Sequence, residues 1–167
     1  MAVQASHGRV LVGVDGSPAS VAAVRWAAAE ARLRGMRLHV VHARDPHAVA
    51  QAYYAPLSAG RGTVGYAADG AVLKTLVREA AGPDGWPAVQ FEVVDGLPVQ
   101  VLLARAPGAV MLVLGSTRPV GLAGVPVGKP RAPLGPVARD CLRAAPCPVV
   151  IVAEPGVQPE AELVRTG

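Results

Sequence analysis

The chain has 167 residues and a formal net charge of +4. This length, with 51% hydrophobic residues, suits one globular domain with its own core. No uncharged apolar run approaches the roughly 20 residues that span a bilayer, and the first nine residues lack the apolar middle of a signal peptide, so we expect a soluble cytoplasmic protein. Aromatic residues make up 4% of the chain and the arginines are dispersed, which argues against a nucleic-acid partner.

The first quarter of the chain predicts a strand, a helix and a second strand. The apolar run from Arg9 to Val14 is followed by the turn sequence DGSP, which is typical of a buried strand that passes into a turn. Ser17 can cap the helix that follows, and Gly35 can end it. Residues 36–43 form the second strand, and the right-handed crossover rule makes the two strands parallel.

The rest of the chain continues this alternation. Residues 44–64 predict a loop without a clear period, residues 72–80 and a segment beginning at Pro98 predict helices, and residues 89–93 and 110–114 predict strands. Gly115 is expected to form a turn, and a short helix and a last strand follow the Gly/Pro-rich loop of residues 117–134. The pattern predicts an α/β, Rossmann-like fold, an open five-stranded parallel sheet with helices on both faces and ligands at the carboxyl ends of its strands.

The expected domain covers residues 9–153, with a flexible N-terminus (1–8) and a flexible C-terminal tail (154–167). Cys141 and Cys147 lack the spacing of a metal or redox motif and are interpreted as buried structural thiols. His39 and His42 are three residues apart in a predicted strand, so they point to opposite faces and cannot share a metal. We therefore assign no metal site. No residue stands out as a general base, so we also assign no catalytic residue.

Five segments carry a resemblance because they occur together in one order and spacing. They are VLVGVDGS (10–17), LHVVHARDP (38–46), VVDGLP (93–98), VMLVLGS (110–116) and LGPVARDCLRAAPCPVVIV (134–152). Through them the chain resembles the universal stress protein (UspA-like) domain family. The resemblance implies a five-stranded Rossmann-like fold, related to the adenine nucleotide α-hydrolases, a dimer formed through the last strand, and a role in stress tolerance. The family divides into members that bind ATP and members that do not.

The resemblance also assigns a site for the adenine and ribose. In the ATP-binding branch they lie near an aspartate after the first strand and near a small apolar residue after the second-strand histidine. These positions fall here on Asp15 and on Ala43, and Gly13 and Val14 directly before Asp15 are further candidate binding residues. An aspartate there can accept a hydrogen bond from a ribose hydroxyl or an adenine amine, or it can instead cap the next turn, whereas Ala43 would contribute only shape.

The phosphate-binding part of the motif is altered in this chain. In the ATP-binding branch it reads Gly, two residues, Gly, nine residues, Gly and then Ser or Thr. Gly115 matches the first glycine, but Arg118 stands at the second, where a side chain hinders close approach of the backbone. Counting residues places the third glycine at Gly128, followed by Lys129, whereas matching the downstream helix places it at Gly135.

We prefer Gly135, because the helix after it agrees with the family residue by residue. Pro136 then occupies the first helical position, where it offers neither a backbone N–H nor a hydroxyl to a phosphate. The leading hypothesis is therefore a non-catalytic stress-response domain in which the binding of ATP, and of Mg²⁺ with it, is weakened or lost.

Two other hypotheses stay open, together with an expected oligomeric state. One is a switch that depends on ATP or another nucleotide, in which Arg118 and Lys129 replace the lost glycine contacts. The other is a slow nucleotide hydrolase. The apolar run from Pro148 to Val152 predicts a homodimer through the last strand, because an unprotected hydrophobic edge strand invites pairing.

Overall fold

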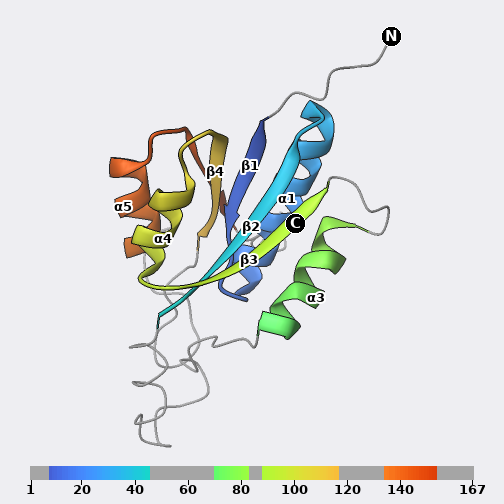
Figure 1. Ribbon diagram of the computed structural model, residues 1–167, viewed down its shortest axis with the longest axis horizontal. Helices are drawn as coiled ribbons and strands as arrows, with labels where there is room; N and C mark the ends of the chain where they lie inside the picture. The colour runs from blue at the N-terminus through green and yellow to red at the C-terminus, as the bar shows by residue number, and fades with distance from the viewer. Residues whose placement is uncertain (1–7, 46–69, 83–87, 117–133, 154–167) are drawn as a thin grey trace, which may run out of the picture.

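The computed structural model describes residues 8–45, 70–82, 88–116 and 134–153 (Figure 1). Strands and helices alternate through these residues as the sequence predicts, with bounds that lie within about two residues of the expected ones. The elements are β1 (Arg9–Gly13), α1 (Pro18–Arg34), β2 (Arg37–Arg44), α3 (Gly70–Ala81), β3 (Val89–Asp95), α4 (Pro98–Arg105), β4 (Ala109–Ser116), α5 (Pro136–Ala144) and β5 (Val149–Ala153).

The five strands form one sheet in the order β3-β2-β1-β4-β5, and every neighbouring pair is parallel. Helices α1 and α3 pack on one face, and α4 and α5 pack on the other. The predicted α/β fold with an open parallel sheet is therefore confirmed. The chain changes direction across the sheet between β1 and β4, which is the position where open α/β sheets leave a crevice for ligands.

Helix α1 begins and ends as its sequence predicts. The Ser17 side chain accepts a hydrogen bond from the Ser20 backbone N–H at 3.2 Å, and Pro18 occupies the first helical position. At the other end Gly35 takes the left-handed conformation, with φ of 63°, and its N–H donates to carbonyl groups of the last turn. These two caps fix the direction in which the helix crosses the sheet.

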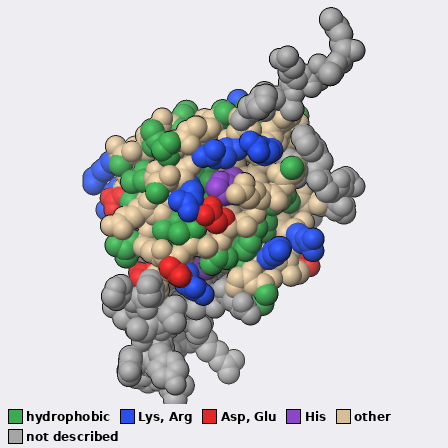
Figure 2. Space-filling view, viewed as in Figure 1, with side chains coloured by type: hydrophobic (Ala, Val, Ile, Leu, Met, Phe, Trp, Pro, Cys, Tyr) green, Lys and Arg blue, Asp and Glu red, His purple; other side chains and the backbone are tan. Residues whose placement is uncertain are grey.

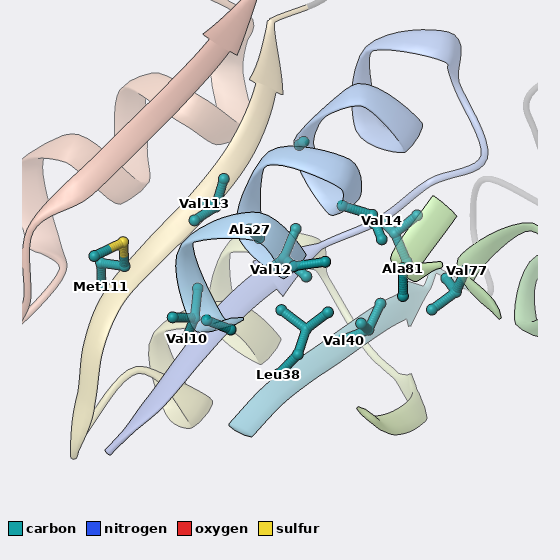
Figure 3. Packing of buried hydrophobic residues seen from close by; sticks show 14 of the residues in the cluster. Val10, Val12, Val14, Ala27, Leu38, Val40, Val77, Ala81, Met111 and Val113 are labelled. Atoms are coloured by element: carbon teal, nitrogen blue, oxygen red, sulfur yellow. The ribbon is translucent and has the colours of Figure 1, made fainter. Parts of the chain in front are cut away.

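The core under α1 is built from branched strand residues and small helix residues. Val12, Val40 and Val113 from three neighbouring strands point toward the helix, whose facing residues include Ala27 (Figure 3). All four side chains are fully buried. Alanine on the contact face lets the helix axis lie close to the sheet, so that few voids are left between the two layers.

The predicted turn at Gly115 is wrong, because β4 continues through Gly115 to Ser116. Gly115 pairs with Val152 of β5, so its backbone belongs to the ladder rather than to a loop. The glycine is required by packing instead. A Cβ at this position would lie 2.5 Å from the carbonyl carbon and oxygen of Ala19 and 2.7 Å from the backbone nitrogen of Ser20, so the start of α1 lies directly against the strand.

The two histidines of β2 lie on opposite faces, as predicted. His42 donates from Nδ1 to the Val14 carbonyl oxygen at 2.9 Å, while His39 contacts Glu92 of β3 through Nε2 at 3.0 Å. Among the described residues no group of three His, Cys, Asp or Glu side chains is placed to hold a metal ion, and no helix is both long and apolar enough to cross a membrane.

Several predictions concern residues that the structure does not describe. The segments 1–7 and 154–167 of the predicted flexible ends lie outside the described residues, and so do nearly all of the predicted loops 44–64 and 117–134. At the margin of these segments, the carbonyl oxygen of Gly8 accepts a hydrogen bond from the Arg37 backbone N–H, and Arg44 is the last residue of β2.

Candidate functional site

A cavity of about 190 Å³ opens where β1 and β4 end, at the position expected from the strand order. Its walls come from the ends of β1, β2 and β4 and from the first turns of α1, α4 and α5. Most of the residues predicted from the sequence line it, namely Gly13, Val14, Asp15, Ala43, Gly115 and Gly135. The remaining three, Arg118, Gly128 and Lys129, lie outside the described residues.

Asp15 is exposed at the mouth of the cavity and caps the turn before α1. Its Oδ1 accepts the Ser17 backbone N–H at 2.9 Å, and its own N–H donates to Ser20 Oγ at 3.3 Å. The capping role considered from the sequence is therefore present. The second carboxylate oxygen has no partner among the described residues, so the same side chain can still accept a hydrogen bond from a ligand.

The inner wall of the cavity is apolar. Leu114 and Leu102 close in on Gly13, where a Cβ would lie 2.8 Å from Leu114 Cδ2 and 3.1 Å from Leu102 Cδ2. Ala43 and Pro98 complete this surface. An apolar wall beside a few polar groups is the arrangement in which proteins hold flat aromatic ligands such as a nucleobase.

The start of α5 forms the opposite wall and carries the groups that would face an anion. The helix begins directly after Gly135, with Pro136 in its first position as predicted, and no side chain caps it. The first hydrogen bond of the helix runs from the Arg139 N–H to the Gly135 carbonyl oxygen at 3.0 Å. The N–H groups of Val137 and Ala138 come before it, so the helix offers them no acceptor. The positive end of the helix dipole therefore lies at the cavity, but Pro136 supplies no donor.

Sequence reasoning missed lining residues that come mainly from helices and their caps, together with Leu114 of β4. Ser17 and Ser20 could have been found, because the cap of α1 directly follows the end of β1. Pro98 and Leu102 of α4 carried no such signal, since only the packing of α4 against the sheet brings them to the cavity. The full set that was missed is Ser17, Ser20, Pro98, Leu102, Leu114, Val137 and Ala138.

The sequence matches characterised proteins along most of its length. A family model described as the universal stress protein family matches residues 7–153. Universal stress protein Rv2623 of Mycobacterium tuberculosis is 37% identical over 150 residues, which cover 86% of this chain and 46% of that protein. The chain thus spans about half the length of the curated relatives that it matches.

Solved structures share the fold. A universal stress protein in complex with cAMP is 26% identical with a TM-score of 0.57, and the match covers 89% of this chain and 98% of the other. A universal stress protein from Archaeoglobus fulgidus in complex with dAMP is 18% identical with a TM-score of 0.52, covering 89% of this chain and 99% of the other. Both have the same arrangement of helices around a parallel sheet.

Proposed function

The chain belongs to the universal stress protein family, and from this premise we propose that it is a non-catalytic stress-response domain that binds an adenine nucleotide mainly through the base and sugar. The cavity between the ends of β1 and β4 is the proposed site. A family member 26% identical to this chain was solved with cAMP, which supports a nucleotide as the class of ligand.

The base and the sugar have suitable surfaces in this cavity. The apolar wall formed by Ala43, Leu102 and Leu114 would cover one face of the adenine. The free carboxylate oxygen of Asp15 would accept a ribose hydroxyl, since its other oxygen stays on the Ser17 N–H. The turn that holds Asp15 is already formed, so binding would not require it to fold.

The single observation that carries the weak-phosphate part of the proposal is Pro136 at the first position of α5. A serine or threonine there would present a backbone N–H and a hydroxyl to a phosphate oxygen, and proline presents neither. The N–H groups of Val137 and Ala138 and the helix dipole remain. They would attract a phosphate group, but with fewer donors than the family motif provides.

The proposal includes no reaction on the nucleotide. Asp15 is the one acidic side chain among the described residues that line the cavity, and its turn-capping hydrogen bond already occupies one carboxylate oxygen. The described lining contains no other carboxylate and no histidine that could act as a general base. Any Mg²⁺ would be carried by the phosphates of the nucleotide rather than by a set of protein ligands.

Calorimetric titration tests the ligand and the weakness of phosphate binding together. We expect ATP with magnesium and adenosine to bind within about tenfold of each other, because the phosphates add less than about 1.4 kcal/mol. ATP binding with a micromolar or lower Kd, far tighter than that of adenosine, would contradict the weak-phosphate proposal. Absence of binding by both ligands would contradict the nucleotide site itself.

Asp15→Asn tests the contact to the ribose while keeping the turn. The asparagine Oδ1 can still accept the Ser17 N–H, but the position of the free carboxylate oxygen becomes an amide N–H₂ that cannot accept. We expect affinity for adenosine to fall about fivefold, which corresponds to about 1 kcal/mol. Glu79→Gln is the matched control, since it removes one exposed carboxylate from α3, away from the cavity. Equal affinities in the two variants would contradict the role of Asp15.

We also propose that two copies of the chain pair through β5. Within the described residues β5 is an edge strand, paired with β4 on one side only. Its residues Val149 to Val152 are all apolar and only half-buried. Pairing with a second copy would cover this surface and satisfy the open backbone groups. We expect sedimentation to show a dimer at micromolar concentration, and a monomer there would contradict the proposal.

The state of the cysteines fits action in the cytoplasm, which we propose as the compartment. Cys141 and Cys147 are free thiols; Cys141 is buried as predicted, Cys147 is only partly buried, and burial raises the pKa of both. Thiols with a raised pKa carry little thiolate at neutral pH and therefore react slowly. Free thiols of this kind are stable in a reducing compartment.

A further inference from the structure

A second hollow lies where the strands begin, at their amino ends, whereas the cavity described above lies at their carboxyl ends. It has a volume of about 350 Å³. On the face shown in Figure 2, blue basic side chains gather around a purple histidine and a red acidic side chain. The residues that line the hollow are Arg9, Arg37, Leu38, His39, Gln90, Glu92 and Arg105.

The hollow is polar although it lies on a face that is apolar elsewhere. Two residues further along their strands, Val41 and Val94 pack in the core under α4 and α5. His39 and Glu92 have the same orientation in the sheet as these valines, because side chains alternate along a strand. The sequence therefore changes from apolar to charged residues where the sheet reaches this edge.

Glu92 is the single carboxylate among the described residues that line the hollow, and both of its oxygens accept hydrogen bonds. Glu92 accepts hydrogen bonds from Arg105 Nη2 at 2.7 Å and from Arg105 Nε at 3.1 Å. Its Oε2 also accepts His39 Nε2 at 3.0 Å. The hydrogen bond from Arg105 is the main cause that lowers the pKa of Glu92, so the group is ionised at neutral pH. Glu92 thus balances the charge of Arg105.

Two further arginines have no carboxylate partner among the described residues. Arg9 donates from Nη2 to the carbonyl oxygens of Arg105 and Pro107 at 2.9 and 2.8 Å, which holds its guanidinium at the carboxyl end of α4. Its Nε is buried and has no acceptor in the part of the chain that the structure describes. Arg37 is exposed and its side chain has no hydrogen-bond partner within the described part of the chain. With three guanidinium groups and one carboxylate, the described lining of the hollow carries a charge of +2.

His39 can respond to an anion in the hollow. Its Nε2 donates to Glu92. The second ring nitrogen, Nδ1, has no partner among the described residues. Burial is the main cause that lowers the pKa of His39, and the charges of Arg9 and Arg105 lower it further, against the raising effect of Glu92. The imidazole is therefore neutral at pH 7. A nearby dianion would stabilise the protonated ring and raise this pKa.

We propose that this hollow binds a phosphate group, either as inorganic phosphate or as part of a small phosphomonoester. A dianion would neutralise the charge of +2, and the unpaired guanidinium of Arg37 can hold two phosphate oxygens at once. Gln90 adds an amide donor at the same surface. The site is separate from the nucleotide cavity, because its residues lie at the opposite ends of the strands.

The test is an NMR titration of the isotope-labelled full chain at constant ionic strength, at pH 7 for binding and over a pH series with and without probe for the His39 pKa. Inorganic phosphate and glycerol 3-phosphate are the two probes. We expect shifts of backbone amides near His39 and Gln90, and a rise of the His39 pKa when either probe is bound. Tighter binding of glycerol 3-phosphate would identify an ester as the natural ligand, and equal binding would identify the phosphate group alone; both support the site.

Two variants with opposite expected effects on phosphate affinity, and one control variant, make the test specific. Arg37→Gln should weaken phosphate binding about tenfold, because it removes the unpaired guanidinium. Glu92→Gln should tighten binding, because it removes the one negative charge in the described lining of the hollow and releases Arg105. Arg25→Gln, which removes an exposed arginine from α1, should have no effect. Equal binding by the Arg25 and Arg37 variants, or no localised shifts at tens of millimolar phosphate, would overturn the proposal.

Discussion

Gly115→Ala is expected to lower the free energy of unfolding by about 3 kcal/mol, at the upper end of the usual cost of overpacking. The added Cβ would lie 2.5 Å from the Ala19 carbonyl group, a distance that real Cβ contacts do not reach. The atoms it meets belong to the backbone of α1 and cannot turn aside. Either the helix or the end of β4 would have to move, and both are packed in the core.

Thermal and urea denaturation measure this effect. For a domain of this size a loss of about 3 kcal/mol lowers Tm by roughly 6–12 °C. Gly13→Ala is the matched control, since the atoms nearest to its Cβ would be the ends of the Leu114 and Leu102 side chains. Leucine side chains can change rotamer, so we expect a cost below about 1.5 kcal/mol. Equal losses in the two variants would show that the contact with α1 does not limit stability.

Pro136→Ser is expected to tighten ATP binding about tenfold and to leave adenosine binding unchanged. The substitution restores an N–H and a hydroxyl at the first position of α5, next to the N–H groups of Val137 and Ala138, which have no acceptor among the described residues. A hydrogen bond to a charged group contributes about 1.5 kcal/mol or more, which corresponds to this change in affinity. Adenosine lacks phosphates, so it reports whether the rest of the cavity has stayed the same.

Calorimetry on two variants separates the donors. Pro136→Ala restores only the backbone N–H, and we expect it to give a smaller gain than serine, about threefold. If ATP and adenosine gain equally in the serine variant, the cavity has changed shape rather than gained phosphate contacts. If neither gains, Pro136 does not limit phosphate binding, and the difference from the family motif must be attributed to the glycine missing at Arg118.

The elements of the fold could be predicted because their signals are local. Ser17 and Gly35 cap α1 through atoms a few residues away, and the apolar runs of the strands reflect burial on both faces of a parallel sheet. Gly115 is the exception, because the contact that requires it is not local. Its glycine looked like a turn, but the requirement comes from Ala19, which lies far away along the chain. No local pattern carries that contact.

The candidate site also combines residues that the sequence identifies with residues that only the packing of distant segments brings together. The resemblance assigned Asp15 and Ala43 at the strand ends, and the fold brings them together because parallel strands end on the same side of the sheet. The contribution of α4 could not be predicted, since Leu102 reaches the cavity only through helix packing. The hollow at the other edge was also beyond sequence reasoning, because Arg9 and Arg105 meet through a fold-dependent hydrogen bond between distant segments.

The contact between Gly115 and the first turn of α1 also has a thermodynamic consequence for ligand binding. Ser20, which lies against Gly115, accepts the hydrogen bond from the Asp15 N–H, so the end of β4 and the Asp15 turn are tied into one unit. The conformational entropy of this corner is lost when the chain folds, before any ligand arrives. A nucleotide would therefore meet a preorganised surface there and lose little affinity to the ordering of the protein.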